Sequence, residues 1–481
     1  MYKIFCFLCM ILFTVLCFSV WSVNQFGNLE IEKLIFLLYV PLKNTPTDWM
    51  RWIWIPFFVT IYLCCWPIAL QKLILKYPLR ASLVFLTLLF GVAIYIEEHF
   101  FVLDYIKGNY TQSDFIEKNY TDPIKVAIEF PIKKKNLIFI QVESLETSVQ
   151  DKANGGFFDM DYIPHLTQLA KDNISFSHSE LIEGATVLPS TGWTIAGMVA
   201  ETAGLPLKLH GKNFMTIDNS MDQYVSFLPG AVSLGDILSK NGYTNVFILG
   251  TGKEFAGQED YLKQHGKYQI FDRDDISVEG KNQSDKAVLE FSKSKILELS
   301  KKTSPFHIMI QTYDTHLGGY NREVCPRIFE EDFKNGFSCI DSQIHDFINW
   351  IQKQKFYKDT MIIILGDHCS MSNDVAAEIE KLNNDDLSSR HNGNIIRKVY
   401  NVLINSTIQP IQKNNRQFST MDMFPTILAG IGVKINGDRL GLGTNLFSAE
   451  RTLPEKYGYD YIFQELKKKS NFYNQKLLYG R

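Results

Sequence analysis

Apolar residues are concentrated in the first hundred positions of this 481-residue chain. Three runs stand out, at residues 5–23, 52–70 and 81–97. A helix needs about 20 apolar residues to cross a bilayer, so the first two runs are long enough and the third is slightly short. We therefore expect residues 1–100 to form an N-terminal bundle of about three transmembrane helices. The shorter run at 30–42 predicts an interfacial helix, although a packed or re-entrant segment also fits it.

A cleaved signal peptide is the alternative for the first run, but no small-x-small cleavage site follows it. The basic residues of the connection after the second run, Lys72, Lys76 and Arg80, place that connection in the cytoplasm by the positive-inside tendency. The N-terminus, with Lys3, then lies on the same side. We expect a multi-pass membrane protein whose remaining residues are extracytoplasmic.

The rest of the chain alternates between strand-like and helix-like patterns. Residues 101–134 are polar and mixed, and they are expected to form a linker with some helix. Apolar runs, typical of strands buried on both faces, then occur at 137–142 and within 244–250, 306–316, 359–368 and 398–405, with amphipathic helical patterns between them. This alternation predicts an α/β fold with a mainly parallel central sheet over residues 135–450. The basic segment 451–481 is expected to be a solvated helix or a frayed tail.

Charge and cysteine content narrow the picture further. The formal net charge of −3 gives no basic field for binding nucleic acid. Five of the eight cysteines lie in the apolar runs, where they act as small hydrophobic residues. Cys325 and Cys339 share one short stretch. A disulfide between them is plausible in an oxidising compartment, and two free thiols are the alternative.

Candidate metal ligands follow the predicted strands directly. Glu143 comes after the first strand, Asp367 and His368 come after "MIIILG", and His316 follows "IMIQTYDT". In open α/β sheets, sites form beyond the carboxyl ends of strands, so these side chains are expected to converge. Carboxylate and imidazole donors suit Mn²⁺ or Zn²⁺, and less well Mg²⁺. Taken singly, Glu143 could be a helix N-terminal acid and "GDH" a simple turn.

The stretch "GATVLPSTGWTIAGMVAETAGLP" places threonines just before a small-residue helix. A bound cation can lower the pKa of a threonine hydroxyl and turn it into a nucleophile. Thr194 fits the N-cap of this helix, because "IAGMVAETAG" follows it. Thr191 is then free to act as the nucleophile.

These motifs together resemble the alkaline-phosphatase-like, sulfatase-type superfamily. Within it, the chain looks like the lipoteichoic acid synthase and phosphoglycerol transferase family. The resemblance rests on an ordered set across residues 135–445: "NLIFIQVESLE", "TGWTIAGMVAETAGLPL", "SLGDILSKNGYTNVFILGTGKEFAGQEDYLKQHG", "TYDTH", the two cysteines, "DTMIIILGDH" and "MDMFPTILAGIG". It implies an alkaline-phosphatase-like sandwich as the catalytic domain.

The resemblance also implies roles for individual residues. A divalent metal is expected to be bound by Glu143, Thr191, Asp367 and His368; Mn²⁺ is the preferred ion, and Zn²⁺ or Mg²⁺ are possible. Thr191 is expected to be the nucleophile, and His316 is expected to lie near the substrate phosphate. Substrate-binding residues are expected at Lys253, Gln258 and Trp193. The stretch "KEFAGQ" departs from the family pattern, because Gln258 stands where a basic residue is common; Lys253 is a possible substitute. His210 and His391 either line the acceptor path or are surface residues.

The implied reaction moves phosphoglycerol from phosphatidylglycerol to a periplasmic or cell-surface glycan through a phospho-threonine intermediate. The closest alternative is transfer of phosphoethanolamine from phosphatidylethanolamine to a surface glycolipid, with zinc. A sulfatase is more remote, because no Cys/Ser-x-Pro/Ala-x-Arg motif surrounds Thr191. The non-catalytic alternative is a membrane-anchored binding protein on an inactivated fold.

Overall fold

The computed structural model describes residues 2–26, 31, 53–208, 227–276, 284–382, 390–391 and 394–480. They divide into two compact units, the first within residues 1–107 and the second from Gly108 onward. The boundary falls inside helix α6 (Val102–Tyr110).

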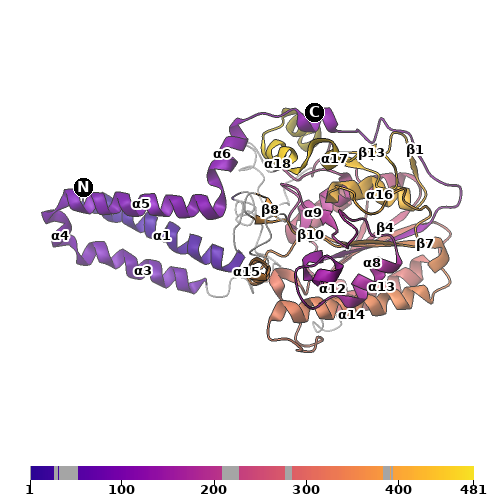
Figure 1. Ribbon diagram of the computed structural model, residues 1–481, viewed down its shortest axis with the longest axis horizontal. Coiled ribbons are helices and arrows are strands. Elements are labelled where there is room, and N and C mark those ends of the chain that lie inside the picture. Colours follow the sequence, from indigo (N-terminus) through magenta and orange to yellow (C-terminus); the bar gives the residue numbers. More distant parts are fainter. Residues whose placement is uncertain are drawn as a thin grey trace. The chain divides into compact units, whose positions relative to one another are not determined.

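The first unit is helical. Its described helices are α1 (Tyr2–Phe26), α3 (Trp54–Ala69), α4 (Gln71–Lys76) and α5 (Pro78–Phe100) (Figure 1). Helix α1 contacts both α3 and α5. The Tyr2 hydroxyl donates to the Pro67 carbonyl at 2.9 Å, and the rings of Phe5 and Phe85 are 5.7 Å apart. Few polar contacts are needed here, because the helices satisfy their own backbone groups.

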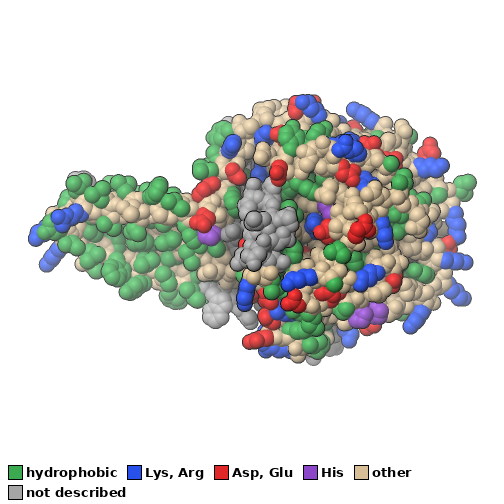
Figure 2. Space-filling view, in the orientation of Figure 1, with side chains coloured by type: hydrophobic (Ala, Val, Ile, Leu, Met, Phe, Trp, Pro, Cys, Tyr) green, Lys and Arg blue, Asp and Glu red, His purple; other side chains and the backbone are tan. Residues whose placement is uncertain are grey.

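Two of these helices are long and apolar enough to cross a membrane: 24 residues at Tyr2–Gln25 and 23 residues at Pro78–Phe100. The third expected span, at 52–70, is a shorter apolar helix of 16 residues, Trp54–Ala69. These helices expose many large apolar side chains, and Figure 2 shows the hydrophobic surface that they form. Examples are Phe7, Ile11, Phe58, Trp66, Leu83 and Phe90. Such a surface suits lipid. The interfacial helix expected at 30–42 lies outside the described residues, apart from Ile31.

A six-stranded sheet forms the centre of the second unit. Its strand order is β11-β7-β2-β6-β4-β5. The strands are β11 (Asn401–Ile404), β7 (Thr360–Gly366), β2 (Asn136–Val142), β6 (Phe306–Gln311), β4 (Thr244–Leu249) and β5 (Gln269–Phe271). All neighbours run parallel except β11, which is antiparallel to β7. The expected α/β fold with a mainly parallel sheet is confirmed.

Helices cover both faces of this sheet (Figure 1). On one face, α8, α13 and α14 share a hydrophobic core with the strands, and on the other face lie α9 and α16. The helices are α8 (Pro164–Asp172), α9 (Thr194–Ala203), α10 (Leu234–Lys240), α11 (Gln258–Gln264), α12 (Arg273–Ile276), α13 (Asp285–Leu299), α14 (Asp332–Gln352), α15 (Asn373–Leu382) and α16 (Met423–Gly430). Double coverage explains why the strands read as continuous apolar runs.

Short two-stranded pairs lie outside the central sheet. They are β1 (Ile128–Glu129) with β12 (Lys434–Ile435), β3 (Ala185–Thr186) with β10 (Lys398–Val399), β13 (Arg439–Leu440) with β14 (Gly443–Thr444), and β8 (Arg390–His391) with β9 (Asn394–Ile395).

The expected linker at 101–134 is wrong for its larger part. From Gly108 onward it belongs to the second unit. Helix α7 (Phe115–Asn119) buries Phe115 and Ile116, and β1 pairs with β12. The sequence pattern conceals this packing, because only a few apolar residues in the segment point inward.

The segment 451–481, expected to be a solvated helix or a frayed tail, is helical but partly packed. It forms α17 (Leu453–Tyr457), α18 (Tyr459–Lys467) and a π-helical turn, Tyr473–Leu478. Tyr473 is fully buried; its hydroxyl donates to the Pro206 carbonyl at 2.8 Å and accepts from the Lys208 amide at 3.1 Å. The globular body therefore extends well beyond the expected limits of 135–450.

Replacing Tyr473 by alanine should destabilise the protein by about 3 kcal/mol, because it leaves a large cavity and two unpaired backbone groups. Tyr473→Phe, which removes only the hydroxyl, should cost about 1 kcal/mol. Tyr461→Ala is the control, since 47% of that side chain is exposed. Denaturant unfolding of the detergent-solubilised protein measures all three. Equal midpoints for Tyr473→Ala and Tyr461→Ala would mean that the tail is frayed after all.

Candidate functional site

The site is assembled at the carboxyl ends of two neighbouring parallel strands. Val142 of β2 lies opposite Gly366 of β7 in register, so the residues that follow, Glu143 and Asp367, emerge side by side. The turn after β2 packs tightly on the end of β7: a Cβ on Gly366 would lie 1.8 Å from the Leu145 carbonyl oxygen. Only glycine fits at that point, so the two strand ends are held together by backbone contact.

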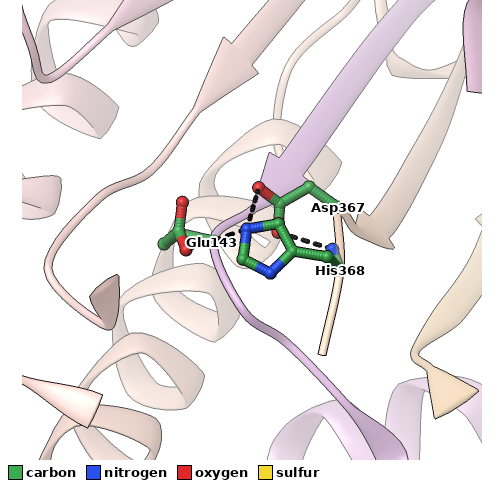
Figure 3. Close-up of side chains that lie close together, drawn as sticks. All are labelled: Glu143, Asp367 and His368. Carbon is green, nitrogen blue, oxygen red and sulfur yellow. Dashed lines mark hydrogen bonds and ion pairs between the residues drawn. The ribbon is translucent and has the colours of Figure 1, made fainter. Parts of the chain in front are cut away.

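Glu143, Asp367 and His368 form a buried donor cluster (Figure 3). One ligand atom from each side chain lies within 4.8 Å of the others. The Nε2 atom of His368 is 3.4 Å from Glu143 Oε1 and 3.4 Å from Asp367 Oδ2. The structure thus brings together three of the residues that the sequence places at strand ends.

Hydrogen bonds orient these three side chains. Asp367 Oδ1 accepts from the backbone N–H groups of Ser144 and His368, both at 2.8 Å, and the Ser144 hydroxyl donates to Glu143 Oε1 at 2.7 Å. His368 Nδ1 is 2.8 Å from the Cys369 carbonyl oxygen, to which it can only donate, so the Nε2 lone pair is left facing the carboxylates. Glu143 Oε2 and Asp367 Oδ2 have no hydrogen-bond partner among the described residues.

Electrostatics at the cluster favour a cation. Burial raises the pKa of Glu143, and the neighbouring Asp367 carboxylate raises it further. Burial also raises the pKa of Asp367, against the opposing effect of His368. Two buried acids with free oxygen lone pairs beside an imidazole nitrogen fit a divalent ion, of which Mn²⁺ and Zn²⁺ match this donor set.

The two candidate threonines are placed differently from the sequence-based expectation. The N-cap of α9 is Trp193, with extended backbone, so the N-cap role expected for Thr194 is wrong. The Thr194 hydroxyl lies 3.4 Å from His368 Nε2. The Thr191 hydroxyl instead donates to the Leu188 carbonyl at 2.8 Å and accepts from the Leu188 N–H at 3.0 Å. The structure therefore brings Thr194, rather than the expected Thr191, to the donor cluster.

A close helix–strand contact explains the position of Thr194. A Cβ on Gly197, one turn further along α9, would lie 2.2 Å from the Asp367 carbonyl oxygen. The helix can approach the end of β7 this closely only because residue 197 is glycine. The start of α9, with Thr194, is thereby held against the loop that carries Asp367 and His368.

His316 follows β6 in a short 3₁₀ turn, His316–Gly318. Its ring stacks on Tyr313 at 4.9 Å between centroids, and the Tyr313 hydroxyl is 3.1 Å from His316 Nδ1. Burial, with a smaller contribution from nearby His368, lowers the pKa of His316 to about 3. The imidazole is therefore neutral at neutral pH.

Two threonines and a buried aspartate that the sequence analysis missed support this region. The Glu143 N–H donates to the Thr312 hydroxyl at 3.0 Å, and the Thr315 hydroxyl donates to the Glu143 carbonyl at 2.6 Å. Asp285 accepts from the N–H groups of Tyr313 at 2.6 Å and Asp314 at 3.0 Å. These contacts tie the His316 loop to the end of β2. In the sequence, the "DTH" motif pointed to the loop, but nothing pointed to Asp285.

A small, tightly packed space that does not admit water adjoins the donor cluster. The residues that line it are Glu143, Leu249, Gly250, Thr251, Phe255, Gln258, Gln311, Thr312 and Tyr313. Gln258, expected to bind substrate, therefore faces the same space as Glu143. Lys253 is not among the lining residues, and its Nζ is 3.9 Å from Glu259 Oε1. Trp193 is buried next to Thr194 in the chain.

The cysteine pair can be placed, but the two remaining histidines cannot. Cys325 and Cys339 form a disulfide. His210 lies outside the described residues, and so does the side chain of His391.

A protein-family model matches most of the second unit. The family model described as Sulfatase matches residues 135–433. Phosphoglycerol transferase I of Escherichia coli (strain SMS-3-5 / SECEC) is 34% identical over 259 residues, which is 50% of this chain and 32% of that protein. The enzyme of the same name from Salmonella paratyphi B is 33% identical over 263 residues, with the same coverage. The matched part spans about half of this chain and about a third of these relatives.

Solved structures agree on the fold. An alkaline phosphatase superfamily protein from Vibrio parahaemolyticus superposes with a TM-score of 0.54 at 19% identity, covering 71% of this chain and 79% of that one. The lipoteichoic acid synthase LtaP from Listeria monocytogenes gives 0.53 at 18% identity, covering 69% and 80%. The alkaline-phosphatase-like sandwich expected from the sequence is confirmed.

Binding of Mn²⁺ or Zn²⁺ should stabilise the metal-free protein against heat, by about 2.7 kcal/mol when the free ion is at about 100 times its Kd. Glu143→Gln and Asp367→Asn should each abolish most of this gain, because each removes a charged ligand atom from the cluster. Glu201→Gln is a matched control: Glu201 is a buried acid bonded to Gln141 at 2.6 Å and lies outside the donor cluster. Thermal melts with and without ion measure the gain. An unchanged gain in both ligand variants would place the ion elsewhere.

Proposed function

The chain belongs to the sulfatase family, and on that premise we propose that it is a membrane-bound phosphoglycerol transferase. Its reaction moves phosphoglycerol from phosphatidylglycerol to a periplasmic or cell-surface glycan. The observation that best supports this proposal is the position of the Thr194 hydroxyl. It lies 3.4 Å from His368 Nε2, beside the buried cluster of Glu143, Asp367 and His368. The relatives that match half of this chain are named phosphoglycerol transferase I, which favours phosphoglycerol as the transferred group.

In this proposal, Thr194 replaces Thr191 as the nucleophile and fourth ligand. Glu143, Asp367 and His368 would hold the divalent cation, which would lower the pKa of a bound hydroxyl and offset phosphate charge. The Thr194 oxygen attacks phosphorus, the bond from phosphorus to diacylglycerol breaks, and the threonine proton passes to the leaving diacylglycerol oxygen, so that phosphoglycerol remains on Thr194. An acceptor hydroxyl then attacks that phosphorus, the bond from phosphorus to Thr194 breaks, and the acceptor's proton passes to the released Thr194 oxygen, with the imidazole of His316 assisting the transfer.

The first unit supports the proposed membrane placement. Two membrane-length helices would hold the enzyme where a lipid donor is available. Lys72, Lys76 and Arg80 favour a cytoplasmic connection, and so an extracytoplasmic catalytic unit in a multi-pass inner-membrane protein. The Cys325–Cys339 disulfide supports the same side, because structural disulfides persist in oxidising compartments.

Incubating the protein with head-group-labelled phospholipids, followed by peptide mapping, should give a phosphoglycerol adduct on Thr194. Thr194→Ala should reduce phosphatidylglycerol consumption by at least about 10³-fold, because the nucleophile is gone. Thr191→Val is the matched control; it removes the hydroxyl that bonds Leu188 and should cost about 1 kcal/mol of stability while keeping the adduct.

Each contrary outcome has a distinct meaning. An adduct on Thr191 would restore the sequence-based assignment. A phosphoethanolamine mass would make the protein a phosphoethanolamine transferase, and full turnover in Thr194→Ala would remove the proposed nucleophile.

A further inference from the structure

The peptide group that joins Cys369 to Ser370 follows the donor cluster directly in the chain. Its carbonyl oxygen, on Cys369, is 2.8 Å from His368 Nδ1 and accepts a hydrogen bond from it. The other ring nitrogen, Nε2, faces the two carboxylates of the cluster (Figure 3). A hydrogen bond at one ring nitrogen fixes the tautomer and the direction of a metal-binding histidine. A residue that holds this peptide group therefore also orients His368.

Glu146 holds the other side of the same peptide group. The Ser370 N–H donates to Glu146 Oε1 at 3.0 Å. Because a peptide group is planar, fixing its N–H also fixes the direction of its carbonyl, which here belongs to Cys369. A chain of hydrogen bonds thus runs from the Glu146 carboxylate, through one peptide group, to the imidazole of His368.

Arg397 completes this arrangement. Its Nη1 donates to Glu146 Oε1 at 2.9 Å, and its Nη2 donates to the Ser370 carbonyl at 2.7 Å. Glu146 is fully buried, and the Ser148 hydroxyl bonds its second carboxylate oxygen. A buried carboxylate is costly unless it is paired and hydrogen-bonded, and Arg397 supplies the pairing charge. The ion pair therefore holds both backbone polar groups of Ser370.

The backbone that carries Arg397 contacts both loops of the donor cluster. The Tyr400 N–H donates to the Leu145 carbonyl at 3.1 Å, in the turn that follows Glu143, and the Tyr400 carbonyl accepts from the Gly366 N–H at 3.0 Å. Segment 397–400 thus bonds the loop of Asp367 and His368 at both of its ends, through Tyr400 at Gly366 and through Arg397 at Ser370. Strand β10, which starts one residue after Arg397, is in turn paired with β3.

We propose that Glu146 and Arg397 are positioning residues for the cation site. Together they hold the Cys369–Ser370 peptide group, and through it they keep Nε2 of His368 directed at the cation. They act on a ligand of the ion and not on the reacting atoms. The inference rests on the cation site of the proposed function, and it is independent of which head group is transferred.

The test is the affinity of the full-length, detergent-solubilised and metal-free protein for Mn²⁺ and Zn²⁺, measured by isothermal titration calorimetry. Glu146→Gln and Arg397→Gln should each raise the Kd at least about tenfold, as is typical when a residue that orients a metal ligand is lost. Arg397→Lys should raise it less, because lysine keeps a positive charge beside Glu146 but lacks the fork that reaches two acceptors. The melting temperature without ion shows whether each variant is folded.

Arg416→Gln is the matched control. Arg416 also belongs to a buried ion pair, with its Nε 2.6 Å from Glu455 Oε1, and it also bonds backbone carbonyls, those of Ser448 and Glu450 at 2.9 Å each. None of these partners belongs to the donor cluster. Arg416→Gln should therefore lower the melting temperature as Arg397→Gln does, but leave the Kd within about twofold of the wild-type value.

The outcomes separate positioning from general stability. A Kd within about twofold of the wild type in both Glu146→Gln and Arg397→Gln overturns the proposal, and so does an equal rise in Arg416→Gln. Should the first two variants not fold, an unchanged Kd in Arg397→Lys overturns it in their place. A wild type that binds neither ion removes the cation site and this proposal with it. One that binds an ion but consumes no phospholipid overturns only the proposed transfer reaction.

Discussion

The parallel register of β2 and β7 is the constraint on which the rest of the site depends. Because Val142 and Gly366 are paired, the chain emerges from both strands at the same level and sets two carboxylates side by side in a buried space. Two such acids repel each other, and each loses hydration, which is why burial and mutual charge raise the pKa of Glu143. A fold keeps such a pair when something positive shares the space, and the His368 lone pair completes a donor set for a cation.

Glycines let other elements reach this point. At Gly366 the turn after β2 contacts the end of β7, and at Gly197 the backbone of α9 contacts the Asp367 carbonyl. These are backbone-to-backbone approaches that any side chain would prevent. They fix the distance between a hydroxyl on a helix and an imidazole on a loop, although the two residues are 174 positions apart. The Thr312 hydroxyl accepts from the Glu143 N–H and the Thr315 hydroxyl donates to the Glu143 carbonyl, and these bonds join the loop after β6 to the same strand end.

The sequence allowed the sheet and most of the donor cluster to be predicted, because both follow from local pattern. Apolar runs indicated β2, β4, β6 and β7, and the residue that follows each strand can then be identified directly in the sequence. The choice between Thr191 and Thr194 could not be made in this way. Threonine is a favoured N-cap residue, and the sequence analysis therefore assigned the N-cap of the helix to Thr194. In the structure Trp193 occupies it. The Thr191 hydroxyl is held by a local turn contact with Leu188, whereas Thr194 is placed by the tertiary contact between Gly197 and Asp367.

The C-terminal segment was misjudged for a related reason. Its lysines give it a solvated appearance, while its inward residues, among them Ile462, Tyr473 and Leu477, are too few to stand out. Tyr473 bonds the backbone at Pro206 and Lys208, and the intervening Leu207 N–H donates to the Ser190 carbonyl at 2.8 Å. Ser190 directly precedes Thr191 in the loop before α9. The end of the chain therefore braces the segment that leads to Thr194, so that the helix carrying the hydroxyl is held from both ends. For the nucleophile proposed at Thr194, a displacement of about 1 Å can cost about 10²-fold in rate, so this remote packing matters to the proposed site as much as the strand ends do.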